Sequence, residues 1–157
     1  MIDRFEGRYR FLSNFYPAIV EYNLLMWNST EHGYQAAKDI RGLDSPIVQK
    51  ILTLDGREAG KSKKLGKQIE KEGFLRPDWK KGFSLEVMEE LLQQKFDPFV
   101  HPDLRRMLDE TKGQELVEGN TWHDNFWGDC ECHECETIPG QNWLGKLLMK
   151  VRDGVLP

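Results

Sequence analysis

The sequence predicts one mainly helical α+β domain with a small antiparallel sheet near the N-terminus. Its 157 residues are the length of a single domain, so we take 1–157 as one domain. Short extended apolar runs gather in the N-terminal quarter of the chain. After that point, apolar residues recur at helical spacing between start and stop signals. These patterns favour a helical domain with a short N-terminal hairpin.

The N-terminal quarter holds the segments from which the sheet is expected. YRFL (9–12) precedes a Ser-Asn turn, and IVEY (19–22) and LLMW (24–27) flank Asn23. Because Asn favours tight turns, the last two segments predict an antiparallel hairpin. ELVE (115–118) could add one further strand to the sheet.

Capping signals predict the first two helices. In NSTEHGYQAAK the helix is expected to begin at Asn28, with Glu31 three residues on, as in a capping box. The next helix has Pro46 at its first position after Ser45, and Asp55-Gly56 closes it. Both predicted helices therefore begin at residues that commonly stabilise a helix N-terminus.

Three more helices are expected in the second half of the chain. The first follows Arg76-Pro77 and extends to about residue 96, because apolar residues recur every four positions from Trp79 onward. A short helix starts at His101-Pro102 and stops at Gly113. The last runs roughly over 142–152 with its leucines on one side.

The composition excludes a membrane protein and a disulfide-framed secreted one. Apolar residues make up 39% of the chain in runs of only a few residues, whereas a spanning helix needs about 20 in a row. The segment MIDRFEGRYRF lacks the apolar stretch of a signal peptide. Three cysteines within six residues favour reduced thiols or metal ligands over a disulfide framework. We therefore expect a cytoplasmic protein that has no membrane partner.

Charge is distributed unevenly along the chain. The net charge is −4, yet residues 57–81 hold nine basic side chains against four acidic ones. This basic block could contact phosphate groups, and a solvated helix face is the alternative. Within KSKKLGK (61–67), a lysine near other cations can lose its proton and attack an aldehyde carbon. Lys63 and Lys64 are the candidates for that role.

Glu31, Gln35 and Lys38 form the first candidate constellation. Spacings of four and seven place these three polar side chains on one face of the expected helix. A carboxylate, an amide and an ammonium group together could bind or activate a polar substrate. The alternative is that Glu31 only caps the helix.

The stretch ELVEGNTWHDNFWGDCECHECE (115–136) holds the second constellation. Trp122, Asp124 and Trp127 combine two ring faces that can stack a planar base with a carboxylate that can orient water. Asn120, in the adjoining Gly-Asn turn, joins the candidate binding residues. The alternative is a buried pair of core tryptophans with Asp124 capping a turn.

The same stretch contains C-E-C-H-E-C (130–135), a pattern typical of metal-binding sites. Thiolates of Cys130, Cys132 and Cys135 could converge on one zinc ion, with His123, His133 or a remote group as the fourth ligand. Exposed thiols on an acidic loop are the alternative. Catalysis is expected to need no cofactor, so such a zinc ion would be structural.

Five stretches in order resemble the YbiA/NADAR family. They are FEGRYRFLSNFYPAIVEYN, NSTEHGYQAAK, RPDW, ELVEGNTWHDNFWG and GQNWLGKLLMKVR, and they run from about Phe5 to Arg152. The resemblance implies a single YbiA-like domain with N-glycosidase activity. YbiA-type members of the family cleave the ribose–base C–N bond of early riboflavin-pathway intermediates, which are ribosylaminopyrimidine phosphates. Other members remove ADP-ribose from guanine in DNA.

The resemblance also assigns residues. The glutamate of the S-x-E-H motif corresponds to Glu31, and the tryptophan of R-P-D-W corresponds to Trp79. The W-x-D-x-x-W group corresponds to Trp122, Asp124 and Trp127. A lysine of an imine route would fall at Lys63 or Lys64. The C-E-C-H-E-C insertion departs from the family pattern.

A nucleotide-like small molecule or an ADP-ribosylated nucleic acid would be the binding partner. A non-catalytic, zinc-stabilised module that binds ADP-ribose or a nucleotide is the alternative interpretation of the whole chain.

Overall fold

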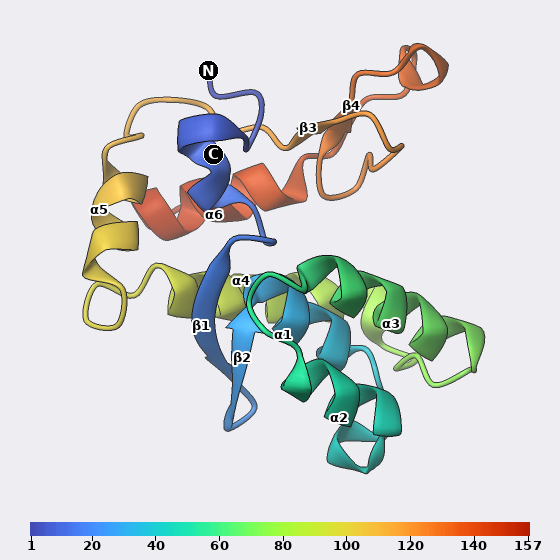
Figure 1. Ribbon diagram of the computed structural model, residues 1–157. Coiled ribbons are helices and arrows are strands. Elements are labelled where there is room, and N and C mark those ends of the chain that lie inside the picture. The colour runs from blue at the N-terminus through green and yellow to red at the C-terminus, as the bar shows by residue number, and fades with distance from the viewer. The chain divides into compact units, whose positions relative to one another are not determined.

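The computed structural model describes all 157 residues, which form two compact units. The terminal unit consists of Met1–Ser13 and Phe96–Pro157, and the central unit is Asn14–Lys95 (Figure 1). Helices dominate both units, as the sequence predicted, and the two-stranded antiparallel sheet belongs to the central unit. Candidate residues from the first half of the chain, including Glu31, lie in the central unit, and those of the 120–135 stretch lie in the terminal unit.

The predicted hairpin is confirmed. β1 (Pro17–Tyr22) pairs antiparallel with β2 (Leu25–Ser29). Asn23 and Leu24 connect them with φ angles of 52° and 64°, the two left-handed residues of a type I′ turn. Inward-facing Val20 and Trp27 pair across the ladder and are buried in the central core.

The prediction that YRFL is extended is wrong. Residues Gly7–Leu12 form the 3₁₀ helix η1 of the terminal unit. Two consecutive residues, Phe11 and Leu12, are both buried there. A strand would turn neighbouring side chains to opposite faces, so one helical turn buries this pair better.

Ser29, and not Asn28, caps helix α1 (Thr30–Ala37). The Ser29 hydroxyl accepts a hydrogen bond from the backbone N–H of His32 at 3.2 Å. Glu31 is therefore the second helical residue, one position before the third, which a capping box from Ser29 would need, so the capping box predicted from Asn28 does not form. Asn28 instead donates through Nδ2 to the Leu54 carbonyl at 2.8 Å.

Three further helices complete the central unit. α2 (Pro46–Thr53) is capped by the Ser45 hydroxyl, as expected from Ser-Pro. α3 (Ala59–Lys71) contains much of the basic block. The block is therefore helical, as the alternative of a solvated helix face requires. α4 (Phe83–Lys95) begins later than predicted, because Gly82 at φ 107° separates it from the 3₁₀ turn η3 (Trp79–Lys81).

The terminal unit combines short helices with a minimal parallel pair. Its elements are η1, α5 (Pro102–Asp109), β3 (Gly119–Asn120), β4 (Asp129–Cys130), η4 (His133–Cys135) and α6 (Trp143–Asp153). α6 buries Leu144, Leu147 and Leu148, as its spacing predicted. ELVE does not join the hairpin, because Leu116 forms an isolated parallel bridge with Ile2.

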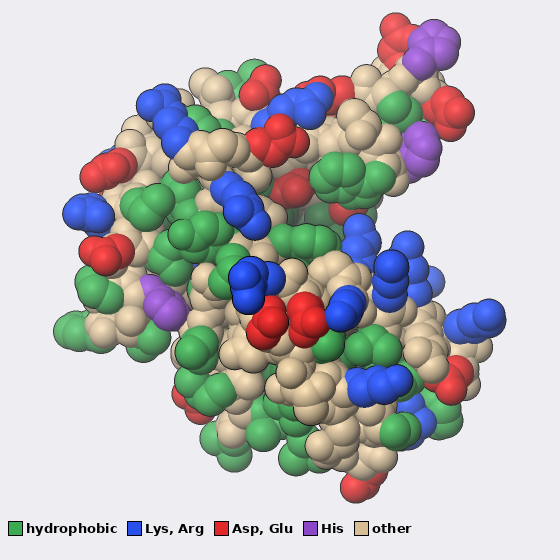
Figure 2. Space-filling model, in the orientation of Figure 1, with side chains coloured by type: hydrophobic (Ala, Val, Ile, Leu, Met, Phe, Trp, Pro, Cys, Tyr) green, Lys and Arg blue, Asp and Glu red, His purple; other side chains and the backbone are tan.

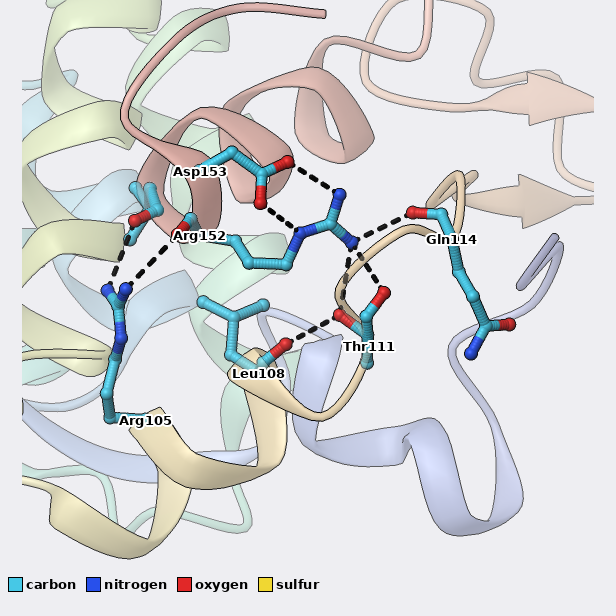
Figure 3. A network of polar contacts seen from close by, with 7 residues as sticks. Arg105, Leu108, Thr111, Gln114, Arg152 and Asp153 are labelled. Atoms are coloured by element: carbon cyan, nitrogen blue, oxygen red, sulfur yellow. Dashed lines mark hydrogen bonds and ion pairs between the residues drawn. The ribbon is translucent and has the colours of Figure 1, made fainter.

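Arg152 fastens the end of α6 within this unit (Figure 3). Its Nη1 donates to the carbonyl oxygens of Thr111 at 2.9 Å and Gln114 at 2.8 Å. Arg105 of α5 donates to the carbonyls of Val151 and Arg152 at 3.1 and 3.2 Å. The bonds from Arg105 satisfy carbonyls at the end of α6 that have no partner within the helix. The bonds from Arg152 join α6 to the segment that follows α5.

A bilayer-spanning helix is absent. The longest helices, α3 and α4, have 13 residues each, well short of the roughly 20 that a span requires.

Candidate functional site

The predicted polar row is present and buried, with two members in α1 and Lys38 at its C-cap. Glu31, Gln35 and Lys38 are 6%, 4% and 8% exposed. Gln35 Nε2 donates a hydrogen bond to Glu31 Oε1 at 2.7 Å, which fixes one side of the carboxylate. Buried charged groups cost free energy unless they are paired, so such a row is typical of a functional site.

Lys38 links α1 to α3 through Glu70. Its Nζ lies 3.4 Å from Glu70 Oε2. Burial lowers the pKa of Lys38, and the negative charges of Glu70 and Glu31 act against that decrease. The positive charge of Lys63 lowers the pKa further. Two carboxylates and two lysines from α1 and α3 therefore form one charged cluster, which we call the α1–α3 cluster.

The structure distinguishes Lys63 from Lys64. Lys63 is half-buried and close enough to Lys38 for their charges to repel, whereas Lys64 is exposed. Lysine and arginine side chains gather over α3 in the space-filling view (Figure 2). If a lysine of this stretch reacts with a substrate in the α1–α3 cluster, Lys63 is better placed for it.

Gly66 allows α3 to approach the polar row. A Cβ atom at Gly66 would overlap the amide end of Gln35, and its distance to Gln35 Cβ would be 3.2 Å. Ser62, Gly66 and Ile69 form the buried face of α3. Small residues at this contact therefore keep Gln35 in position against Glu31.

Trp79 lies in the core beneath α1. Its side chain is 4% exposed, and its ring centroid is 5.1 Å from that of Tyr34 and 6.2 Å from that of Phe83. Lys38 Nζ in turn is 5.5 Å from the Tyr34 ring centroid. Trp79 thus supports the helix that carries Glu31, and its predicted contact with substrate stays a prediction.

In the terminal unit, Asn120 organises the loop that carries Asp124. Asn120 is buried, and its Oδ1 accepts the backbone N–H groups of Trp122 and Asp124 at 3.2 and 3.1 Å. Its Nδ2 donates to the Asp124 carbonyl at 2.8 Å. Asn120 therefore holds the loop backbone, and its contact with substrate stays a prediction.

Asp124 caps a turn, and the tryptophans beside it are not a core pair. Asp124 Oδ1 accepts the N–H groups of Phe126 at 3.1 Å and Trp127 at 2.9 Å. Trp122 is 55% exposed, and Trp127 is half-buried with its ring edge-on to Phe126 at 4.9 Å. The capping alternative is correct for Asp124, and the buried-pair alternative is wrong. An exposed indole next to a fixed carboxylate suits base stacking.

The start of α6 holds the other side of this loop. The N–H groups of Trp143 and Leu144 donate to the carbonyls of Phe126 and Trp127 at 3.1 and 3.0 Å. These N–H groups have no partner inside α6, so the loop satisfies the helix end and the helix fixes the loop. Asn142 contributes by accepting the Glu118 N–H at 3.0 Å.

The three cysteines converge with one histidine. One ligand atom from each of His123, Cys130, Cys132 and Cys135 lies within 4.8 Å of the other three. Of the two histidines considered from the sequence, His133 is excluded because its side chain is 97% exposed and contacts Glu136.

The thiols of Cys130 and Cys135 differ in acidity. Burial raises the pKa of Cys135 to about 11. For Cys130 burial acts in the same direction, but hydrogen bonds from the Cys132 and His123 backbone and from neighbouring thiols outweigh it and lower its pKa to about 7.

Sequence reasoning missed Glu70, the buried-face Gly66 and the support that Tyr34 gives to Lys38. Glu70 lies seven residues after Lys63 and hence on the same side of α3. That spacing would have pointed to Glu70, had 59–71 been predicted as a helix.

Comparison with known proteins gives consistent matches. The NADAR domain family model matches residues 3–156 and so spans both units. N-glycosidase Npun_R5314 of Nostoc punctiforme is 33% identical, over 94% of this chain and 86% of that protein. The chloroplastic riboflavin biosynthesis protein PYRR of Zea mays is 35% identical over 92% of this chain.

The relatives differ in how much of their own length the chain covers. The chain spans 23% of the maize protein, and 35% of riboflavin biosynthesis protein VVA0006 of Vibrio vulnificus, which is 33% identical. Among solved structures, the NMR structure of E. coli YbiA has a TM-score of 0.75 at 28% identity. That match covers 98% of this chain and 86% of YbiA.

Proposed function

Since this chain belongs to the NADAR family, we propose that it is a hydrolase that cleaves an N-glycosyl bond. The observation that carries the proposal is the buried row of Glu31, Gln35 and Lys38 on α1. The Nostoc relative, which is named as an N-glycosidase, supports it because the chain covers most of that protein's length.

The chemistry requires negative charge near the sugar. Breaking a ribosyl C–N bond develops positive charge at C1 as the base departs with its electron pair. One carboxylate stabilises that charge, and a second removes a proton from the attacking water. We assign these two roles to Glu31 and Asp124, in either order.

Each carboxylate has positioning groups within its own unit. Gln35 orients Glu31 through its 2.7 Å hydrogen bond. Trp122, with its exposed ring, would stack the departing base together with Trp127. Lys38 and the lysines of α3 would meet the substrate's phosphate or pyrophosphate.

The substrate is one of two classes. One is a phosphorylated ribosylaminopyrimidine, in line with the names of the maize and Vibrio relatives. The other is ADP-ribosylated guanine in nucleic acid, for which the lysine-rich α3 offers phosphate contacts. No cofactor is needed for either reaction, and the unpaired cysteines fit the reducing cytoplasm in which we place the activity.

Product mass spectrometry tests the function. The protein is incubated with each substrate class, and the released base and sugar are identified. We expect Glu31→Gln to fold normally and to lose base release by roughly 100-fold or more. Glu21→Gln, which makes the same change at an exposed position of β1, should keep full activity.

Two results would contradict the proposal. One is full activity in Glu31→Gln on every substrate that the wild type cleaves. The other is measurable affinity for ADP-ribose or a nucleotide with no product after long incubation, which would favour the binding-module interpretation.

A borohydride experiment separates direct water attack from an imine route. Reduction during turnover should trap a sugar adduct on Lys63 if the imine forms, and peptide mass spectrometry would locate it. Absence of the adduct during measured turnover would exclude the lysine route and leave the carboxylate mechanism in place.

A further inference from the structure

Four groups that commonly bind transition metals meet in the terminal unit without a role in the proposed hydrolysis. They are the imidazole of His123 and the thiols of Cys130, Cys132 and Cys135. Cys130 and Cys135 are buried, and they come from β4 and η4. Thiol and imidazole groups held together in this way are the usual ligands of tetrahedral zinc.

The distances match a single ion. Zinc bonds of about 2.3 Å to sulfur and 2.0–2.1 Å to nitrogen in tetrahedral geometry would place nitrogen and sulfur roughly 3.5 Å apart. His123 Nδ1 lies 3.4 Å from Cys135 Sγ and 3.3 Å from Cys132 Sγ. All four ligand atoms lie within 4.8 Å of one another, so small rotations of side chains would complete the geometry.

The surroundings of His123 support a ligand role. Its backbone has φ 69°, a left-handed conformation that a residue with a side chain adopts rarely. With Nδ1 facing the thiols, Nε2 is 3.8 Å from Glu134 Oε2. A carboxylate near the second nitrogen is the arrangement that orients zinc-bound histidines, and a slight shift would close that hydrogen bond.

We propose that His123, Cys130, Cys132 and Cys135 bind one structural zinc ion, which holds residues 120–136 in shape. All four positions of the tetrahedron would be filled by protein, so the ion would have no open position for substrate. Because His123 stands between Trp122 and Asp124, fixing its imidazole fixes the backbone of both. This proposal does not depend on the hydrolytic function.

Zinc content tests the ligand set. The full chain, produced with zinc and kept reduced, should retain about one zinc per chain by elemental analysis. Cys132→Ser and His123→Ala should each lower zinc affinity at least tenfold. His133→Ala is the matched control, because it removes a neighbouring histidine outside the cluster and should retain the metal. Absence of zinc from the wild type, or equal loss in the two histidine variants, would overturn the proposal.

Cobalt substitution tests the geometry without any variant. Metal-stripped wild type should bind one Co²⁺ and show the intense visible absorption of tetrahedral cobalt with thiolate ligands, and zinc should displace it. The weak absorption of a six-coordinate ion, or no binding, would contradict the site.

Hydrogen exchange tests the structural role. Removing the metal should speed amide exchange in 120–136 by tenfold or more and leave α1–α4 unchanged. Equal exchange with and without zinc would overturn the role in holding this stretch in shape.

Discussion

At the scale of one residue, Lys38 shows that a polar candidate site lowers the stability of the folded protein. Its side chain is buried next to a second lysine, and burial lowers its pKa. A lysine whose folded pKa is below its unfolded value destabilises the folded state at neutral pH. That cost is relieved as pH rises from the folded pKa toward the ordinary lysine value. A protein keeps such a group where function needs the charge.

We predict that Lys38→Met stabilises the protein and weakens its activity. Methionine fills similar space without the charge whose burial lowers the pKa of Lys38, so the free energy of unfolding at pH 7 should rise by about 1 kcal/mol. The gain should shrink as pH rises toward the ordinary lysine pKa, because burial lowers the pKa of Lys38 and the wild-type side chain loses its proton before an exposed lysine would. KM should rise, because the proposed contact of Lys38 with the substrate's phosphate would be lost. Urea denaturation at several pH values and steady-state kinetics measure both effects.

Lys67→Met is the control for this experiment, because Lys67 is exposed on α3 and its replacement should change stability little. A lower unfolding free energy in Lys38→Met than in wild type at pH 7 would contradict the interpretation of Lys38.

At the scale of elements, the contact between α1 and α3 places the polar row. α3 was not predicted as a packed helix, because its many lysines read equally well as a solvated face. The information lies in its small residues. Ser62 and Gly66 are small enough for another helix to pack closely against α3. The residues next to them in the sequence do not indicate which helix that is. The side chain that packs against Gly66 comes from a distant part of the sequence, so no local pattern predicts it.

Two glycines of α3 give a matched pair of substitutions. Gly66→Ala would force Gln35 to move and break its hydrogen bond to Glu31, so kcat/KM should fall about tenfold or more. In Gly60→Ala the new Cβ would lie 4.0 Å from Phe15 Cε2, which is ordinary contact. Alanine there should raise stability by about 0.5–1 kcal/mol, through helix propensity, without changing activity. Equal activity of the two variants would contradict the role assigned to Gln35.

Local chemistry explains which elements the sequence predicted. Pro46 after Ser45, the turn at Asn23 and the leucines of α6 each act within a few residues, and these elements were predicted correctly. The errors arose where neighbouring signals competed. Asn28 and Ser29 are both good caps, and only the fold selects Ser29.

For the candidate site, the sequence predicted which side chains share one helix face, and it did not predict which other segments they contact. The row on α1 followed from helical spacing alone. The carboxylate partner of Lys38, and the choice of His123 over His133, required chain segments to meet, which no local pattern reports. The roles of Glu31 and Asp124 rest on the family resemblance and on chemistry.

At the scale of the whole molecule, the proposed function assigns one carboxylate of each unit, Glu31 and Asp124, to the same reaction. Asp124→Asn keeps an oxygen that can accept the Phe126 and Trp127 N–H groups, so this change removes the charge and spares the turn. Glu31→Gln likewise removes only charge. The most direct test is the kcat/KM of both single variants and of the double variant.

We predict that each single variant loses roughly 100-fold or more in kcat/KM. The double variant should be little worse than the poorer single one, because residues that act as a unit in one transition state are not additive. Full activity in Asp124→Asn, or losses that simply multiply in the double variant, would contradict the shared role of these two carboxylates.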